Sequence, residues 1–148
     1  MSGGVAAVDT DVLAIHHIFT WDKRWKTNAS ALFLLRRKYI FCIPIHGLLE
    51  LYGLAILAWG VEKARVLFKG YLKAKDVKIM GYAFPSSWEE YVDIVSSYIE
   101  RRMNYGDALI AWTLEENDVE VFVTWNKKHF KGKVSAKVYT PEELLRIG

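Results

Sequence analysis

Three acidic residues, widely separated in a chain of 148 residues, have surroundings in which a carboxylate could do chemistry. Asp9 directly follows a short apolar run, Glu50 lies within an almost wholly apolar stretch, and Asp107 lies near the start of a helical pattern. A carboxylate taken out of water without a partner is too costly to keep ionised, so Glu50 requires a basic neighbour or a bound cation. Of the residues one helical turn away from it, only His46 could be that neighbour.

Each of these acids also has an ordinary structural explanation. Asp9 could cap the helix that follows it, since Asp is favoured at that position. Asp107 lies three residues after Asn104, which is the spacing of a capping box. Glu50 could lie on the exposed stripe of an amphipathic helix. What the three share is that each falls where the predicted fold could bring it to the same end of a sheet.

A cluster of these three acids would need a positive ion. Carboxylates within ~5 Å of one another repel by roughly 3 kcal/mol per pair at an effective dielectric constant near 20. Oxygen ligands select hard cations, which favours Mg²⁺ or Mn²⁺. The four His residues and the single Cys are too sparse and too badly spaced for a zinc site.

Short apolar runs alternate with helical patterns along the sequence. Strands are predicted at residues 5–8, 40–45, 77–80, 119–124 and 134–139. Helices are predicted at 22–38, 47–59 and 62–74, from a capping box at Ser87 and Glu90 to about Arg102, from about Asn104 onward, and after Thr140. This alternation predicts an α/β fold, a three-layer α/β/α sandwich around a central parallel sheet of four to five strands. Open sheets of this kind place their chemistry at the carboxyl ends of the strands.

Length and composition predict one globular domain over residues 1–148. The chain is 52% hydrophobic and 14% aromatic, which excludes a disordered chain. The single Cys42 lies in an apolar run and is expected to be a buried, reduced thiol. The first residues have no basic start followed by an apolar stretch, so we expect no secretory signal and a cytoplasmic protein.

The apolar stretch at residues 39–60 approaches the length of a membrane span. Glu50 lies at its middle, where a charged residue costs about 2.5 to 3.5 kcal/mol on insertion scales. Pro44 and His46 interrupt its first half. We therefore expect a buried core helix and no association with a membrane.

The positive residues are clustered although the net charge is only +3. Lys127, Lys128 and Lys131 lie close to Trp125 and Phe130, an arrangement that suits a phosphate backbone with bases stacked on rings. Taken alone, such clusters are more simply explained as solvated faces of a modestly basic protein.

Four segments, VDTDVL, LLELYG, GDALIAW and VTWNKKHF, resemble in this order the acidic motifs of the PIN-domain nucleases, which include the VapC-type toxins of toxin–antitoxin pairs. The resemblance covers essentially the whole chain. It implies a PIN-like fold and metal-dependent cleavage of RNA, with Asp9, Glu50 and Asp107 as the catalytic acids that bind Mg²⁺ or Mn²⁺. General-base help could come from Asp107 or Asp9.

The resemblance also implies supporting roles. Thr10 and Thr124 match hydroxyl positions that orient the acids, and Asp11 stands where the family often has Asn. The departures are Asn126, where many members carry a fourth Asp, and His129, where a further acid is frequent. Asn126 can coordinate or orient water but cannot supply charge, so a single well-held metal is expected.

The partners that the resemblance implies are an RNA substrate and an antitoxin protein. Lys127, Lys128 and Lys131 would steer the RNA backbone toward the acids, although an ordinary solvated loop explains them equally well. The aromatic residues between Phe19 and Phe33 suggest a surface for a second copy of the chain, in a homodimer, or for an antitoxin peptide. A helix that faces the core is the simpler explanation for the same residues.

Two other functions remain in view. The sequence from Asp9 to Asp11 imitates the opening of phosphatases of the haloacid-dehalogenase type, but their late Gly-Asp motif should follow a strand, and Asp107 falls between two helical patterns. A catalytically silent PIN-like module that binds RNA or a protein is the second alternative, and Asn126 is the residue that favours it.

Overall fold

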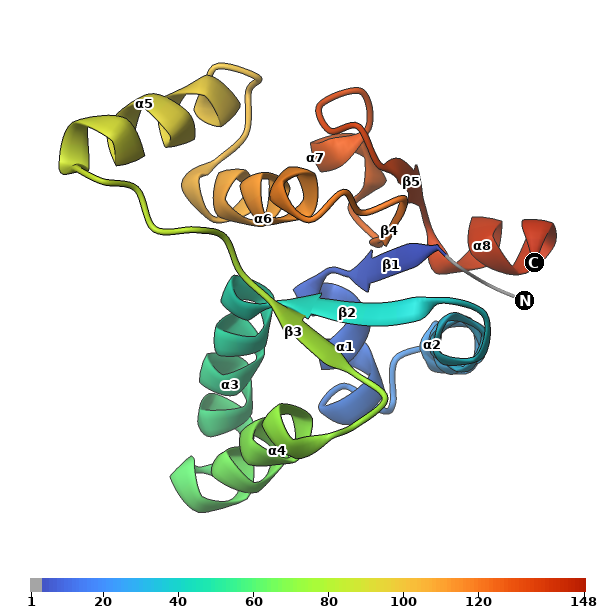
Figure 1. The fold of residues 1–148 in the computed structure, drawn as a ribbon. Helices are drawn as coiled ribbons and strands as arrows, with labels where there is room; N and C mark the ends of the chain where they lie inside the picture. Colours follow the sequence, from blue (N-terminus) through green and yellow to red (C-terminus); the bar gives the residue numbers. More distant parts are fainter. Residues whose placement is uncertain (1–3) are drawn as a thin grey trace.

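Five short strands form a parallel sheet at the centre of the computed structural model, which describes residues 4–148 (Figure 1). The strands are β1 (Val5–Val8), β2 (Ile40–Pro44), β3 (Lys78–Met80), β4 (Val121–Val123) and β5 (Lys137–Tyr139), in the order β3-β2-β1-β4-β5. Every neighbouring pair is parallel; Ala6 of β1, for example, is in register with Phe41 of β2 and Val121 of β4. The central strands are buried on both faces, which explains why they are continuous apolar runs.

Helices cover both faces of this sheet. One core packs α1 (Thr10–His17), α2 (Trp25–Lys38), α3 (Ile45–Trp59), α4 (Val61–Lys73) and α8 (Pro141–Ile147) together with the strands. A second core packs the strands against α5 (Trp88–Ile99), α6 (Tyr105–Glu116) and α7 (Lys127–Phe130). The predicted three-layer α/β/α sandwich with a parallel sheet is therefore confirmed.

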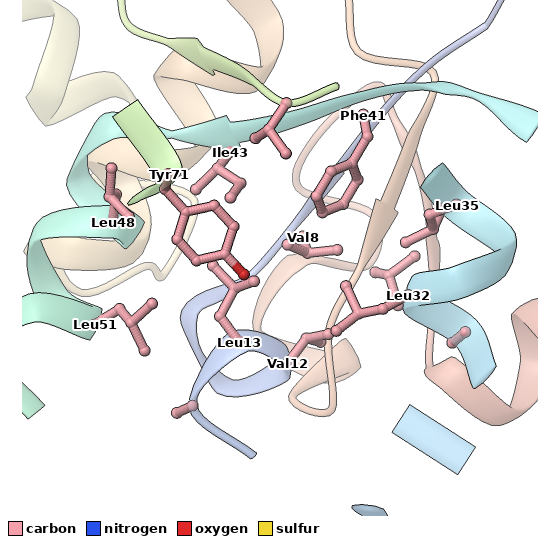
Figure 2. Close-up of a cluster of buried hydrophobic side chains, with 14 of the residues drawn as sticks. Val8, Val12, Leu13, Leu32, Leu35, Phe41, Ile43, Leu48, Leu51 and Tyr71 are labelled. Carbon is pink, nitrogen blue, oxygen red and sulfur yellow. The ribbon is translucent and has the colours of Figure 1, made fainter. Parts of the chain in front are cut away.

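Figure 2 shows how the first core fixes the helices that carry site residues. Val8 and Ile43 of the sheet meet Leu13 of α1 and Leu48 of α3, all at 1% exposure or less. Burying a side chain of this size contributes about 1.5 to 3 kcal/mol. The same packing holds the start of α1 beside the start of α3, since a Cβ on Gly47 would lie only 3.3 Å from the Thr10 hydroxyl.

Two expected capping boxes are only half formed. Ser87 accepts a hydrogen bond from the Glu90 amide, but the Glu90 carboxylate bonds instead to the Ser86 hydroxyl. Asn104 accepts from the Asp107 amide at 2.8 Å, whereas the Asp107 carboxylate points to another residue. A complete capping box forms at Thr140, with Pro141 in the first turn as predicted.

Helix α7 was missed because its four residues are too few for a periodic pattern. In the part of the chain that the structure describes, no helix is both long and apolar enough to cross a membrane.

Candidate active site

Asp9 is buried at the point where β1 ends and α1 begins. Its Oδ1 accepts from the Thr10 amide at 2.8 Å, so it does cap α1, as its ordinary explanation predicted. Its Oδ2 accepts from the Thr124 hydroxyl, also at 2.8 Å. Thr124 directly follows β4, the strand beside β1, and is completely buried. Capping therefore uses only one of the two carboxylate oxygens, and Thr124 holds the other in place.

Asp11, in the first turn of α1, lies next to Asp9 and shares partners with it. Its Oδ2 accepts from the Trp125 amide at 3.0 Å and from the Asn126 side chain at 3.3 Å. Its Oδ1 is buried and has no hydrogen-bond partner within the described residues. An unpartnered buried carboxylate oxygen is costly unless something else contacts it, which is the property of a ligand position.

Glu50 reaches the same place from α3, but its setting differs from the expected one. The residue is exposed, so the prediction of a buried charge that needs compensation was wrong. The reason is that α3 packs through its other face, with Leu48, Leu51 and Ala55 buried, and presents Glu50 on its exposed side. Its contact is the Thr10 hydroxyl, which donates to Oε1 at 2.8 Å. His46 hydrogen-bonds to Tyr82.

Asp107 enters from the other face of the sheet, in the first turn of α6. Its Oδ2 lies 3.3 Å from Nδ1 of His129, which is on α7. Burial raises the pKa of Asp107, and the neighbouring His129 opposes that rise. Because Asn104 binds the backbone amide of Asp107 and not its carboxylate, capping of the helix and a role of the carboxylate in the site are compatible.

These residues line one pocket of about 350 Å³. Asp9, Asp11, Glu50, Asp107 and Asn126 supply part of its polar wall, and its apolar side chains are Ala14, Ile15, Phe19 and Leu54. The pocket lies beyond the carboxyl ends of β1 and β4, where open α/β sheets bind ligands.

The electrostatics of the pocket oppose full ionisation of its acids. Burial raises the pKa of Asp9 to about 7, with a further contribution from the charge of Asp11. Burial likewise raises the pKa of Asp11 to about 6, against hydrogen bonds from the backbone of Trp125. In residues 4–148, no three His, Cys, Asp or Glu side chains form a group that could hold a metal ion. The acids thus share a pocket without converging on a single point.

The predicted lysines are not part of this pocket. Lys127 is bound at 2.9 Å by both carboxylate oxygens of Glu143 on α8, and this ion pair ties α7 to α8. Lys128 and Lys131 are exposed. In the part of the chain that the structure describes, the residues that line the pocket include none of these three lysines.

The prediction missed Arg24 and Asp22, which do line the pocket. The Arg24 guanidinium donates two hydrogen bonds to Asp22 and lies over the Trp125 ring, 5.1 Å from its centroid. The Asp-x-Arg spacing was visible in the sequence, but its place beside the acids depends on how the segment between α1 and α2 folds back.

No protein-family model matches the sequence, and no curated protein matches it. The fold, in contrast, matches solved structures. A chain of the DNA-bound VapBC complex from Salmonella typhimurium aligns with a TM-score of 0.65 at 17% identity, over 93% of this chain and 98% of that chain. VapBC-1 from nontypeable Haemophilus influenzae aligns with a TM-score of 0.63 at 16% identity, over 93% and 98%. VapC20 from Mycobacterium tuberculosis, described as a toxin that cleaves the sarcin–ricin loop, aligns with a TM-score of 0.62 at 16% identity, over 88% and 98%.

These TM-scores show a common fold, and identities this low support nothing beyond it. The chain therefore has the PIN-like fold of the VapC toxins, as its motifs predicted.

Proposed function

We propose that this protein is a metal-dependent endoribonuclease that acts in the cytoplasm, and that it is the toxin of a toxin–antitoxin pair. The observation that carries the proposal is the shared pocket: Asp9 at the end of β1, Glu50 on α3 and Asp107 on α6 face one cavity beyond the ends of parallel strands. The likeness to VapC toxin structures supports the same function.

The donor set of the pocket fits a hard divalent cation. Carboxylate oxygens dominate it, and Asp11 contributes a buried oxygen that lacks a hydrogen-bond partner within residues 4–148. Burial raises the pKa values of Asp9 and Asp11, and a bound cation would favour their ionised forms. Because the acids of the described residues do not converge on one point, Asp9, Glu50 and Asp107 would have to draw together around Mg²⁺ or Mn²⁺ to hold it. Such an ion would activate water and offset charge on the phosphate oxygens during in-line attack.

The rest of the site would keep the acids in position. Thr124 fixes one oxygen of Asp9, and Thr10 holds Glu50 toward the pocket. Asn126 donates to Asp11 and so orients it without adding negative charge. With Asp9, Glu50 and Asp107 as the ligands and the amide Asn126 in place of a fourth acid, a single well-held ion is the expected occupancy. Asp107 or Asp9 would accept the proton from the attacking water.

Cleavage assays test this proposal directly. Mixed RNAs are incubated with the purified protein and Mg²⁺ or Mn²⁺, with chelator, and with the variants Asp9→Asn and Asp107→Asn; Asp93→Asn, exposed on α5, is the matched control. We expect cleavage by the parent and by Asp93→Asn only. Activity that survives chelator or both site substitutions would refute the site.

The second candidate is a catalytically silent module that binds RNA or a protein through the same fold. Asn126 favours it, because its amide occupies one oxygen of Asp11 and supplies no charge. Binding of RNA in chelator, with no cleavage in any metal, would select this alternative.

The antitoxin is proposed by analogy with the VapBC complexes. The test is co-expression with the small protein encoded immediately upstream, if there is one. Inhibition of cleavage by that protein, in a complex that co-purifies, is the expected result.

A further inference from the structure

A second hollow, of about 580 Å³, is lined mainly by aromatic side chains. We name it the aromatic pocket; its rings belong to Tyr82, Phe84, Trp88, Tyr91 and Tyr105, and residues 85–87 complete the lining. Phe84 is 92% exposed and Trp88 is 82% exposed. Large aromatic side chains gathered on a surface in this way indicate a binding site.

The aromatic pocket adjoins the acid pocket through two connections. Tyr105 opens α6, two residues before Asp107, and a Cβ on the intervening Gly106 would lie 3.8 Å from Oε2 of Glu50. On α3, His46 precedes Glu50 by one turn and hydrogen-bonds to the Tyr82 hydroxyl at 3.0 Å. Figure 1 shows the segment between β3 and α5 leaving the sheet beside the start of α3. The walls of the two pockets are therefore in contact, which places the aromatic pocket next to the acids.

Part of the aromatic pocket is held rigidly. The Tyr82 ring stacks on the buried Trp112, with 3.5 Å between centroids, and the hydroxyls of Tyr91 and Tyr105 are hydrogen-bonded to each other. Only one hydrogen is needed for that bond, so the second hydroxyl hydrogen can be donated to a ligand. The rings of Trp88 and Tyr91 are nearly perpendicular, with 5.8 Å between centroids, and most of the Trp88 side chain is exposed to solvent.

The chemistry of the lining selects a flat, neutral group. Among residues 4–148, no charged side chain lines this pocket. Glu89 and Glu90 open α5 beside it, and Glu90 bonds to Ser86. Their negative charge disfavours a phosphate or a carboxylate in the pocket, whereas a nucleobase offers a π-face for stacking and a polar edge for hydrogen bonds.

We propose that the aromatic pocket binds one unpaired base of the RNA, next to the phosphate that is cut, and so selects the cleavage position. This inference rests on the proposed ribonuclease function. It assigns to Phe84, Trp88 and Tyr105 a role in choosing the substrate, separate from the carboxylates that act on the phosphate.

The experiment pairs variants of the pocket with RNAs that lack one base. Single-stranded oligonucleotides carry one abasic residue, moved position by position past the cut. For the parent, one position beside the cut should slow cleavage about tenfold or more. The double variant Phe84→Ala/Trp88→Ala should cut intact RNA about tenfold more slowly and lose its sensitivity at that position, while Trp88→Phe should keep it. Leu57→Ala, an exposed apolar residue on α3 outside both pockets, is the control and should behave as the parent.

Binding in chelator gives a readout that does not depend on activity. Fluorescence anisotropy should show that the parent binds intact RNA more tightly than the abasic form, and that the double variant binds both equally. The inference is overturned if parent and double variant respond alike to the missing base. A second result would also overturn it: sedimentation shows that the parent is a dimer and the double variant a monomer, and the double variant loses cleavage equally on intact and abasic RNAs. The rings would then belong to an interface between copies of the chain. A parent that cuts no RNA refutes the proposed function instead, and the anisotropy still decides whether the pocket binds a base.

Discussion

Replacing Asp9 with Asn should stabilise the metal-free protein and reduce the further stabilisation that a bound metal ion provides. Asp9 is only 7% exposed and lies beside the charge of Asp11. Burial raises its pKa to about 7, from an ordinary value of 3.8. The unfolded chain therefore loses this proton more easily than the folded chain, so ionisation of Asp9 lowers the free energy of unfolding.

The magnitude follows from the shift in pKa. A difference of about three pKa units, at 1.36 kcal/mol per unit, gives an upper bound of about 4 kcal/mol at pH 8, where Asp9 is ionised in both states. This loss in the free energy of unfolding is present in full above pH 7. It shrinks as the pH falls from 7 toward 4, because Asp9 of the folded protein then regains its proton. Asn has nearly the same shape and is itself a good helix cap. Its oxygen can accept from the Thr10 amide and its NH₂ can donate to the Thr124 hydroxyl, so both contacts of Asp9 can be kept.

The assay is urea unfolding, followed by circular dichroism, of the parent, Asp9→Asn and the exposed control Asp93→Asn. In chelator at pH 8, Asp9→Asn should be more stable than the parent by about 2 to 4 kcal/mol, and the gain should be smaller at pH 5. Mn²⁺ at a hundred times its dissociation constant should stabilise the parent by about 2.7 kcal/mol and Asp9→Asn by less. Asp93→Asn should follow the parent throughout.

The reasoning is refuted if Asp9→Asn is less stable than the parent in chelator at pH 8. That result would mean that Asp9 is ionised without cost and acts only as a helix cap. Equal stabilisation of the parent and Asp9→Asn by Mn²⁺ would show instead that this carboxylate binds no ion.

Three further predictions test other parts of the structure. Thr10→Val removes the hydroxyl that holds Glu50 and should reduce RNA cleavage about 10- to 100-fold with a weaker response to Mn²⁺; an unchanged metal titration would exclude this role. Burial lowers the pKa of His17 to about 4, so between pH 6.5 and 4 the unfolded chain binds more protons than the folded chain. Between pH 7 and pH 5 the free energy of unfolding should therefore fall by about 2 kcal/mol more for the parent than for His17→Gln, and an equal fall for both would contradict the prediction. Phe130→Ala empties a completely buried position and should lower the free energy of unfolding by about 3 to 5 kcal/mol, compared with about 0.5 kcal/mol or less for the exposed Phe33→Ala; similar losses for the two would place Phe130 outside the core.

The sequence by itself determined the layers of the fold and much of the site. Apolar runs and helical periodicity act within one strand or a few turns, so the strands β1 and β2 and the helices α3 and α4 were predicted to within about two residues at each end. The acidic motifs also named several of the residues that line the pocket, among them Asp9, Glu50 and Asp107.

Tertiary packing decided what each of those side chains does. The hydrogen bond from Thr10 to Glu50 joins residues 40 positions apart, and that from Thr124 to Asp9 joins residues 115 apart. No local pattern encodes such pairs, because they depend on how two helices and two strands pack. The same reason explains why the apolar neighbours of Glu50 suggested a buried charge, although the packed face of α3 is the opposite one. Likewise, only the folded chain brings Glu143 to Lys127, and only the path from β3 to α5 gathers five aromatic rings beside the acids.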